Sequence, residues 1–290
     1  MRSTHCSSER PQDGRGRAWS RALRALGALA ALTATAAAHD LWLEPSNHRP
    51  RVGDLVDVGL RVGMGFRGDA LKRDEQRIVR FAAIDERGGE TALLGIDGRA
   101  PAGYWRPREA GPFALVYESK PAAIELEAAK FEAYLVEEGL EHVSRLRQER
   151  GQTTLAGREL YSRSVKSLVV VEGAHPAAST AFDRRVGLPF EIVPTRDPWA
   201  ARAGDELSFR VWYDGQPLPG VLVELLSHSD VEHLAHGRTD AQGCVKLKVA
   251  AEGAQLVQAC WMVPAPEAAG ADWRSTWTSL TFSSRAPASR

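Results

Sequence analysis

Short runs of alternating apolar and polar residues, separated by turn residues, are the feature that most restricts how this chain can fold. The run Asp54–Val62 alternates with a period of two, which is the pattern of a strand with one buried face. Glu206–Tyr213 repeats the pattern, and Asp97-Gly98 and Thr239–Gly243 are turn signals between such runs. The sequence therefore predicts a mostly β protein.

One stretch departs from this pattern. Between Ile124 and about Glu149, apolar residues recur at helical spacing with Glu, Lys and Arg between them, and Gly151 follows. This spacing predicts one or two amphipathic helices inserted among the strands.

The length of 290 residues fits one large domain or two ordinary ones. From Phe190 to Phe282, short strands alternate regularly with Gly, Pro and Asp turns, which favours a β-sandwich of about a hundred residues. We expect an all-β fold with a helical insertion, built from two β-sandwich domains of the Ig-like or transthyretin-like type. The predicted domains are residues 39–186, with the helical insert around 124–150, and residues 187–285.

Residues 1–38 have the features of a secretory signal peptide. They carry six arginines, and an apolar stretch from Ala25 to Ala38 follows, too short for the roughly 20 residues of a membrane-spanning helix. Ala36 and Ala38 form an A-x-A cleavage site, so the mature chain is predicted to begin at His39. A buried or interfacial alanine-rich helix is the alternative. Such a signal predicts export of the mature protein out of the cytoplasm.

Composition argues against nucleic acid as a partner and leaves open whether the chain forms a disulfide. The 37 basic and 37 acidic residues form no basic stripe after residue 38, so nucleic acid is not an expected partner. No second stretch approaches membrane length, which predicts a soluble mature protein. Cys6 is removed with the signal. Cys244 and Cys260 remain, and a disulfide or two buried thiols are equally compatible with the sequence.

The predicted mature N-terminus is the strongest candidate for chemistry. A terminal His39 offers both an α-amine and an imidazole to one metal ion, and such nitrogen donors suit Cu, Ni, Co or Zn. The three-residue amino-terminal copper and nickel motif has histidine third, where this chain has Leu41, so further ligands must come from elsewhere. Asp40, Glu44 and His48 are the nearest in sequence, but on a strand Asp40 and Glu44 point to the face opposite His39. The alternative is that His39 binds nothing.

A second group of histidines is a weaker candidate metal site. His228, His233 and His236 lie within nine residues together with Asp230, but their spacing matches no tight structural zinc pattern. The segment is predicted to be a polar surface loop. The chain also lacks a G-x-S-x-G elbow and an H-E-x-x-H helix, so no motif supports an enzyme.

Six segments together resemble the DUF4198 family, in the family's order and over nearly the whole predicted mature chain. This resemblance implies an exported protein of Gram-negative bacteria, a periplasmic component linked to nickel or cobalt uptake, with His39 as the position that carries over. The segments around 213–243 also resemble a transthyretin-like or carboxypeptidase-regulatory sandwich. The six segments are AHDLWLEP (38–45), RVGDLVDVGLRVGMGF (51–66), GLPFEIVP (187–194), YDGQPLPGVLVE (213–224), TDAQG (239–243) and DWRSTWTSLTF (272–282).

Three hypotheses follow. The first is a periplasmic accessory protein that binds a nickel, cobalt or copper ion through His39 and presents it to a membrane metal transporter. The second is a non-catalytic β-sandwich module that binds protein or glycan without metal. The third is an oxidative copper enzyme built around the terminal histidine, which needs a second histidine opposite the first. Metal titration of chains with and without a free His39 amine discriminates the first two.

Overall fold

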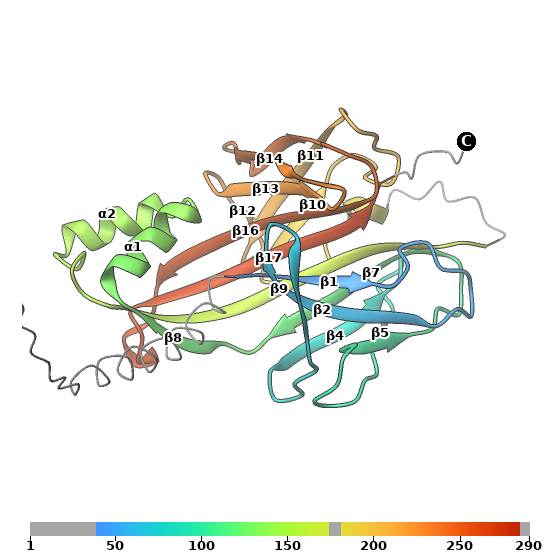
Figure 1. Ribbon diagram of the computed structural model, residues 1–290, viewed down its shortest axis with the longest axis horizontal. Coiled ribbons are helices and arrows are strands. Elements are labelled where there is room, and N and C mark those ends of the chain that lie inside the picture. Colours follow the sequence, from blue (N-terminus) through green and yellow to red (C-terminus); the bar gives the residue numbers. More distant parts are fainter. Residues whose placement is uncertain (1–38, 174–180, 285–290) are drawn as a thin grey trace, which may run out of the picture. The chain divides into compact units, whose positions relative to one another are not determined.

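A computed structural model describes residues 39–173 and 181–284 of the chain. The predicted signal peptide and its cleavage site lie outside these residues. The described part of the chain is mostly β, with 51% of its residues in strands and 10% in helices, and its sheets form a sandwich-like arrangement (Figure 1). This confirms the predicted fold class of an all-β protein with a helical insertion. None of the described helices is long and apolar enough to span a membrane.

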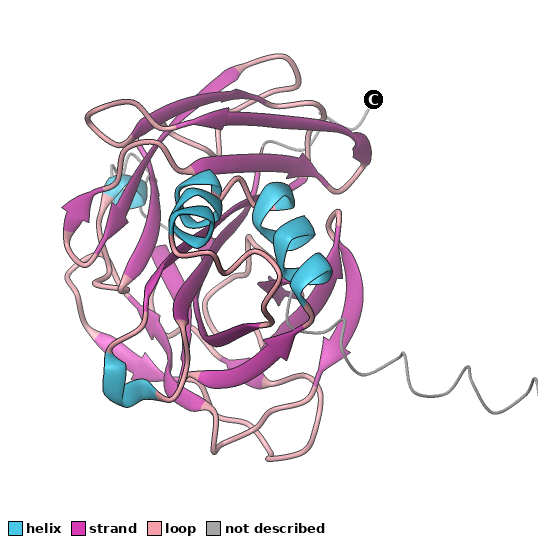
Figure 2. Cartoon of the chain, turned by 90° about the vertical axis from the view of Figure 1, so that its left-hand side faces the viewer, coloured by secondary structure: helices cyan, strands magenta, loops and turns pink. Residues whose placement is uncertain are grey.

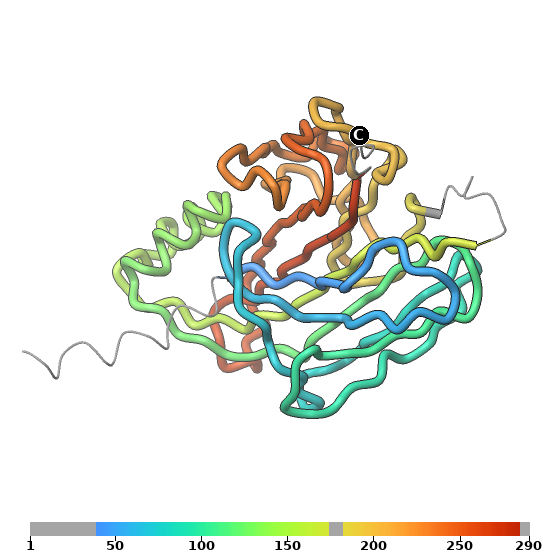
Figure 3. The backbone as a smooth tube through the Cα atoms, turned by 45° about the vertical axis from the view of Figure 1, so that its right-hand side comes forward, coloured from blue at the N-terminus to red at the C-terminus, as the bar shows by residue number. Residues whose placement is uncertain are grey.

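A nine-stranded central sheet runs through the molecule in the order β14-β13-β16-β17-β9-β7-β4-β5, with β8 paired to β9. Its strands are antiparallel except for β17 and β9, which pair in parallel along the middle of the sheet. Figure 3 shows this pairing, because the late strand β17 lies beside the mid-chain strand β9. The strands are β4 (Ile78–Ile84), β5 (Glu90–Ala92), β7 (Gly111–Ser119), β8 (Ala122–Leu126), β9 (Gly157–Val171), β13 (Leu222–Ser227), β14 (Asp230–Arg238), β16 (Ala254–Pro264) and β17 (Trp273–Ser283).

Two smaller sheets pack against the central sheet. In the first, β2 pairs with β1, β3 and β6; in the second, β11 pairs with β10, β12 and β15. We call these the N-terminal sheet and the C-terminal sheet. The N-terminal sheet contains β1 (Asp40–Pro45), β2 (Val56–Met64), β3 (Arg67–Leu71) and β6 (Gly103–Trp105); the C-terminal sheet contains β10 (Phe190–Pro194), β11 (Glu206–Tyr213), β12 (Gln216–Pro217) and β15 (Cys244–Lys248).

The small sheets lie on opposite faces of the central sheet, as alternation along β4 shows. Phe81 and Ala83 join the core beneath the N-terminal sheet, whereas Ala82 and Ile84 join the core beneath the C-terminal sheet. Successive side chains of a strand point to opposite faces, so a strand covered on both sides must be apolar at nearly every position. The run Leu168–Val171 has this composition, and all of its residues are buried, as are the polar residues Lys166 and Ser167 that precede it.

The predicted insert forms two helices, α1 (Ala128–Glu137) and α2 (Glu141–Glu149). The predicted helical segment began at Ile124, but residues up to Leu126 belong to β8, because they complete a register of backbone pairs with β9. Phe131, Leu135 and Val143 turn their apolar sides onto one end of the central sheet. Figure 2 views the molecule from this end, with the two helices in front of the strands. A 3-10 turn, η1 (Ala181–Asp183), precedes β10, and a second, η2 (Glu267–Ala269), lies between β16 and β17.

The central sheet joins both halves of the chain. β9 and β17 come from either side of residue 187 and share a continuous register, and the described residues from 39 to 284 belong to one compact unit. The two-domain division at this position stays a prediction.

Candidate functional site

The helices and the N-terminal sheet cover the same face of the central sheet, and a group of acidic side chains lies where they meet. Asp40 is the first residue of β1, Glu138 follows the last residue of α1, and Glu224 lies in β13. We call these three the acidic cluster. His39 directly precedes β1 and is half-buried.

Local sequence explains why Glu138 lies there. A backbone hydrogen bond from the Glu138 N–H to the Tyr134 carbonyl closes the last turn of α1, which ends at Glu137. Gly139 follows with a left-handed φ of 64°. A Cβ at Gly139 would lie 2.9 Å from the Leu222 side chain in β13. Only glycine combines this backbone conformation with such close packing, so Gly139 lets the end of α1 approach the strand that carries Glu224.

Two carboxyl groups of the cluster, Asp40 and Glu138, have a raised pKa. Burial raises the pKa of Asp40 to about 7, and the negative charge of Glu224 contributes to this increase. A hydrogen bond with Gln258 and the positive charge of Arg163 lower the same pKa and offset part of the increase. Burial also raises the pKa of Glu138 well above its usual range, and the charges of Asp40 and Glu224 raise it further. A cation bound beside Asp40 and Glu138 would favour the ionised forms that burial and like charges disfavour.

Gln258 joins the cluster from β16. Its Nε2 donates a hydrogen bond of 3.0 Å to Glu224 Oε2, which holds that carboxylate against the sheet. Its Oε1 is buried and has no hydrogen-bond partner within the described residues. Buried polar oxygens are normally paired, so the unpaired Gln258 Oε1 is a further oxygen that could bind a cation near the three carboxyl groups.

A fully buried polar layer lies beneath the helices on the same face. The Arg163 guanidinium lies 4.6 Å from the Trp277 ring centroid, and burial lowers its pKa. Tyr134 stacks on Trp277 with ring centroids 5.8 Å apart, and its hydroxyl donates to Glu159 at 3.3 Å. The Tyr134 hydroxyl also lies 3.6 Å from Cys260 Sγ. Because Arg163 and Asp40 affect each other's pKa, this layer connects electrostatically with the acidic cluster.

The other predicted site histidines lie apart from His39. His48 and His228 line one groove beside the N-terminal sheet. His233 and His236 are exposed on β14, where the sequence had predicted a loop. The segment is a strand because its backbone pairs with β13, in a register that places His236 opposite Glu224.

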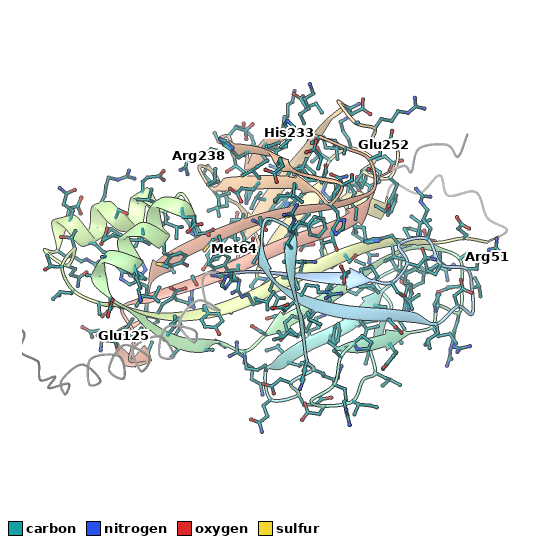
Figure 4. All side chains as sticks on the ribbon, viewed as in Figure 1. Arg51, Met64, Glu125, His233, Arg238 and Glu252 are labelled. Atoms are coloured by element: carbon teal, nitrogen blue, oxygen red, sulfur yellow. The ribbon has the colours of Figure 1, made fainter. Side chains whose placement is uncertain are left out.

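The histidines of β14 do not converge. Residues three apart on a strand point to opposite faces, so His233 and His236 diverge. His233 instead pairs with Asp230 at 2.7 Å, and it projects from the outer part of the molecule (Figure 4). Among residues 39–173 and 181–284, no three His, Cys, Asp or Glu side chains are already arranged to hold one metal ion.

The two cysteines do not pair. Cys260 is buried in β16 and Cys244 is half-buried in β15, and both are free thiols. The sequence left this question open, and the strands separate them, because β15 belongs to the C-terminal sheet and β16 to the central sheet.

Sequence reasoning missed Glu138, Glu224 and Gln258. Each lies in an ordinary amphipathic helix or strand, and no spacing rule links them to Asp40. Only the register of Glu224 with Gln258 and the turn at Gly139 bring them together.

Similarity to solved structures is weak, and no curated protein is significantly similar to this sequence. The adhesin InvE of Yersinia pseudotuberculosis is 13% identical, with 86% of this chain and 59% of that chain covered and a TM-score of 0.21. The D00-D0 domain of Intimin is 10% identical, with 84% and 99% covered and a TM-score of 0.18. The three N-terminal domains of the bacteriophage RB49 Hoc protein are 10% identical, with 83% and 59% covered and a TM-score of 0.16. The chain thus spans about three-fifths of the InvE chain.

Sequence similarity to a family is more extensive. The model of a domain of unknown function, DUF4198, matches residues 36–262, which include His39, all three members of the acidic cluster and Gln258. The chain therefore belongs to the DUF4198 family.

Proposed function

We propose that this protein is a periplasmic metal-binding accessory protein, which binds a nickel, cobalt or copper ion at His39 and the acidic cluster. Three acidic side chains from separate elements meet beside the residue that signal cleavage would make N-terminal, and this convergence is the observation that carries the proposal. Membership of DUF4198 supports it, because the resemblance implies a link to nickel or cobalt uptake.

The donor types suit such an ion. A processed His39 would supply an amine and an imidazole nitrogen, and Asp40, Glu138 and Glu224 would supply carboxylate oxygens. The amine exists only after cleavage, so the uncleaved chain lacks one of the proposed ligands. Binding also needs the proposed ligand side chains to rearrange, since no three-ligand group is preformed in the described residues.

A bound divalent cation would remove the electrostatic cost of the cluster. Burial, and to a smaller extent the neighbouring negative charges, disfavours the charged forms of Asp40 and Glu138 in the metal-free protein. A cation reverses this balance, because it favours the ionised carboxylates. Release to a membrane metal transporter, the partner that this role requires, would follow from protonation of the same groups or from competing ligands.

The test compares the chain beginning at His39 with one that carries an added N-terminal alanine. Calorimetric titration with Cu²⁺, Ni²⁺ and Co²⁺ is expected to show binding that weakens by about tenfold or more with the added residue, since one chelating nitrogen is displaced. E138Q and E224Q are expected to weaken binding as well. E149Q, an exposed glutamate at the end of α2, is the matched control.

Equal affinity of the two chains would contradict the role of His39, and equal affinity of E138Q, E224Q and E149Q would contradict the role of the cluster. Absence of metal binding in every chain would instead favour the alternative of a non-catalytic module that binds protein or glycan.

A further inference from the structure

We propose that the groove beside the N-terminal sheet binds a short zwitterionic peptide of two or three residues. This proposal does not rest on metal binding at His39. The groove has a volume of about 590 Å³ and lies between β1, the β2–β3 hairpin and the turn after β13. Cavities of this size are typical of sites for small molecules.

The groove offers a carboxylate-binding group at one end. Arg61 of β2 donates from Nε to Glu44 Oε2 at 2.5 Å, and both side chains are partly exposed, at 35% and 41%. The two Nη groups of Arg61 have no partner within the described part of the chain. This planar pair of donors matches a carboxylate with two parallel hydrogen bonds.

An acidic group lies further along the same face of β2. Asp57 lines the groove, and its carboxylate makes no ion pair or hydrogen bond with a described residue. Asp57 and Arg61 are four residues apart on one strand, so both side chains leave the same face, with Cα atoms about 13 Å apart. An extended peptide of two or three residues covers about 3.3–3.6 Å per residue, so with a hydrogen bond at each end it has a length comparable to this separation.

A glycine keeps the floor open between these two charges. Gly59 lies between Asp57 and Arg61 on the same face of β2, and it is opposite Glu44 in the strand register. A Cβ at Gly59 would lie 3.3 Å from the Glu44 backbone oxygen. An alanine there would narrow the floor against β1.

The walls suit small apolar side chains. Pro45, Leu71, Pro101 and Ala254 line the groove together with the rings of His48 and His228. Burial lowers the pKa of His48 to about 4, so its imidazole is neutral at physiological pH and adds no charge. The two charged ends and the small apolar walls together favour a peptide such as alanyl-alanine over a single ion.

The test is calorimetric titration of the purified protein with alanyl-alanine, N-acetyl-alanyl-alanine and alanyl-alaninamide, in a buffer that contains a chelator. We expect the free dipeptide to bind and each blocked form to bind at least about tenfold more weakly, because each lacks one charged contact. R61M and D57N should each lower affinity for the free dipeptide to a similar extent.

R158M is the matched control, because Arg158 forms a comparable ion pair with Asp272 at 2.7 Å outside the groove. Thermal melts of all variants separate loss of binding from loss of folding, and G59A, which leaves every charged group in place, should also bind more weakly. The proposal is overturned by absence of binding at millimolar dipeptide, by equal affinity for free and blocked peptides, or by unchanged binding in folded R61M. The chelator makes each of these outcomes independent of the metal site.

Discussion

Lys166 Nζ lies 2.7 Å from Glu191 Oε1, and both side chains are fully buried between the central sheet and the C-terminal sheet. Glu191 also accepts hydrogen bonds from the backbone N–H groups of Val186 and Gly187, at 2.8 and 3.2 Å. This pair therefore fixes the segment that enters β10 against β9, across the predicted domain boundary.

Removing the lysine alone should be costly. K166M leaves a buried carboxylate without its partner, and we expect the free energy of unfolding to fall by about 3–5 kcal/mol. In K166M/E191Q the remaining group is neutral and can still accept the backbone hydrogen bonds, so the loss should be smaller. Urea unfolding measures both. A double variant as unstable as K166M would show that the uncompensated charge is not the cause.

Asp40 should make stability depend on pH. With a usual pKa of 3.8 and a folded-state pKa of about 7, the unfolded chain ionises first as pH rises, so this group lowers stability between about pH 4 and 7. D40N removes the effect and should stabilise the metal-free protein at pH 7 by about 4 kcal/mol, since each unit of pKa difference corresponds to about 1.4 kcal/mol. At pH 4 the two proteins should be equally stable. Thermal melts across this range test it, and a constant difference at both pH values would contradict it.

If a metal binds at His39, protons should compete with it. The amine and Asp40 must both lose protons, so affinity should fall as pH decreases from 8 to 6, by about tenfold or more. At a free metal concentration of 100 times Kd, the processed chain should gain about 2.7 kcal/mol of stability, which a chelator removes. Titrations at several pH values measure the effect, and pH-independent binding would exclude these groups as ligands.

Packing of its buried side chains should stabilise α1 on the central sheet. Leu135 is fully buried in α1, and L135A should lower the free energy of unfolding by about 2–5 kcal/mol. The next residue, Val136, is 74% exposed, and V136A is expected to change stability by less than about 0.5 kcal/mol. Equal effects of the two substitutions in urea unfolding would mean that α1 is not packed as described.

The free cysteines should differ in reactivity. Burial raises the pKa of the Cys260 thiol well above its usual range, and the charges of Glu138 and Glu159 add to this. A thiol reagent should therefore modify Cys244 in the native protein and Cys260 only after unfolding. Counting modified thiols by mass spectrometry checks this, and a protein without any reactive thiol in denaturant would indicate a disulfide.

Parts of the site could be anticipated from sequence and parts could not. Asp40 was recognisable because it adjoins the predicted cleavage site. His48 and His228 were candidates too, but their shared groove arises because the turn after β13 lies beside the N-terminal sheet. Glu138 and Glu224 carried no signal, since a glutamate on an amphipathic helix or strand normally faces solvent.

Alternation of apolar residues determined that the chain is β-rich, because the pleat of a strand sends successive side chains to opposite faces whatever its neighbours are. The helical spacing after Leu126 determined the inserted helices for a similar, local reason. Tertiary structure alone decided which strands pair, such as β17 with β9, since many apolar faces are compatible with one another. The acidic cluster depends on those pairings, because its members meet only when β1, α1 and β13 are packed on one sheet.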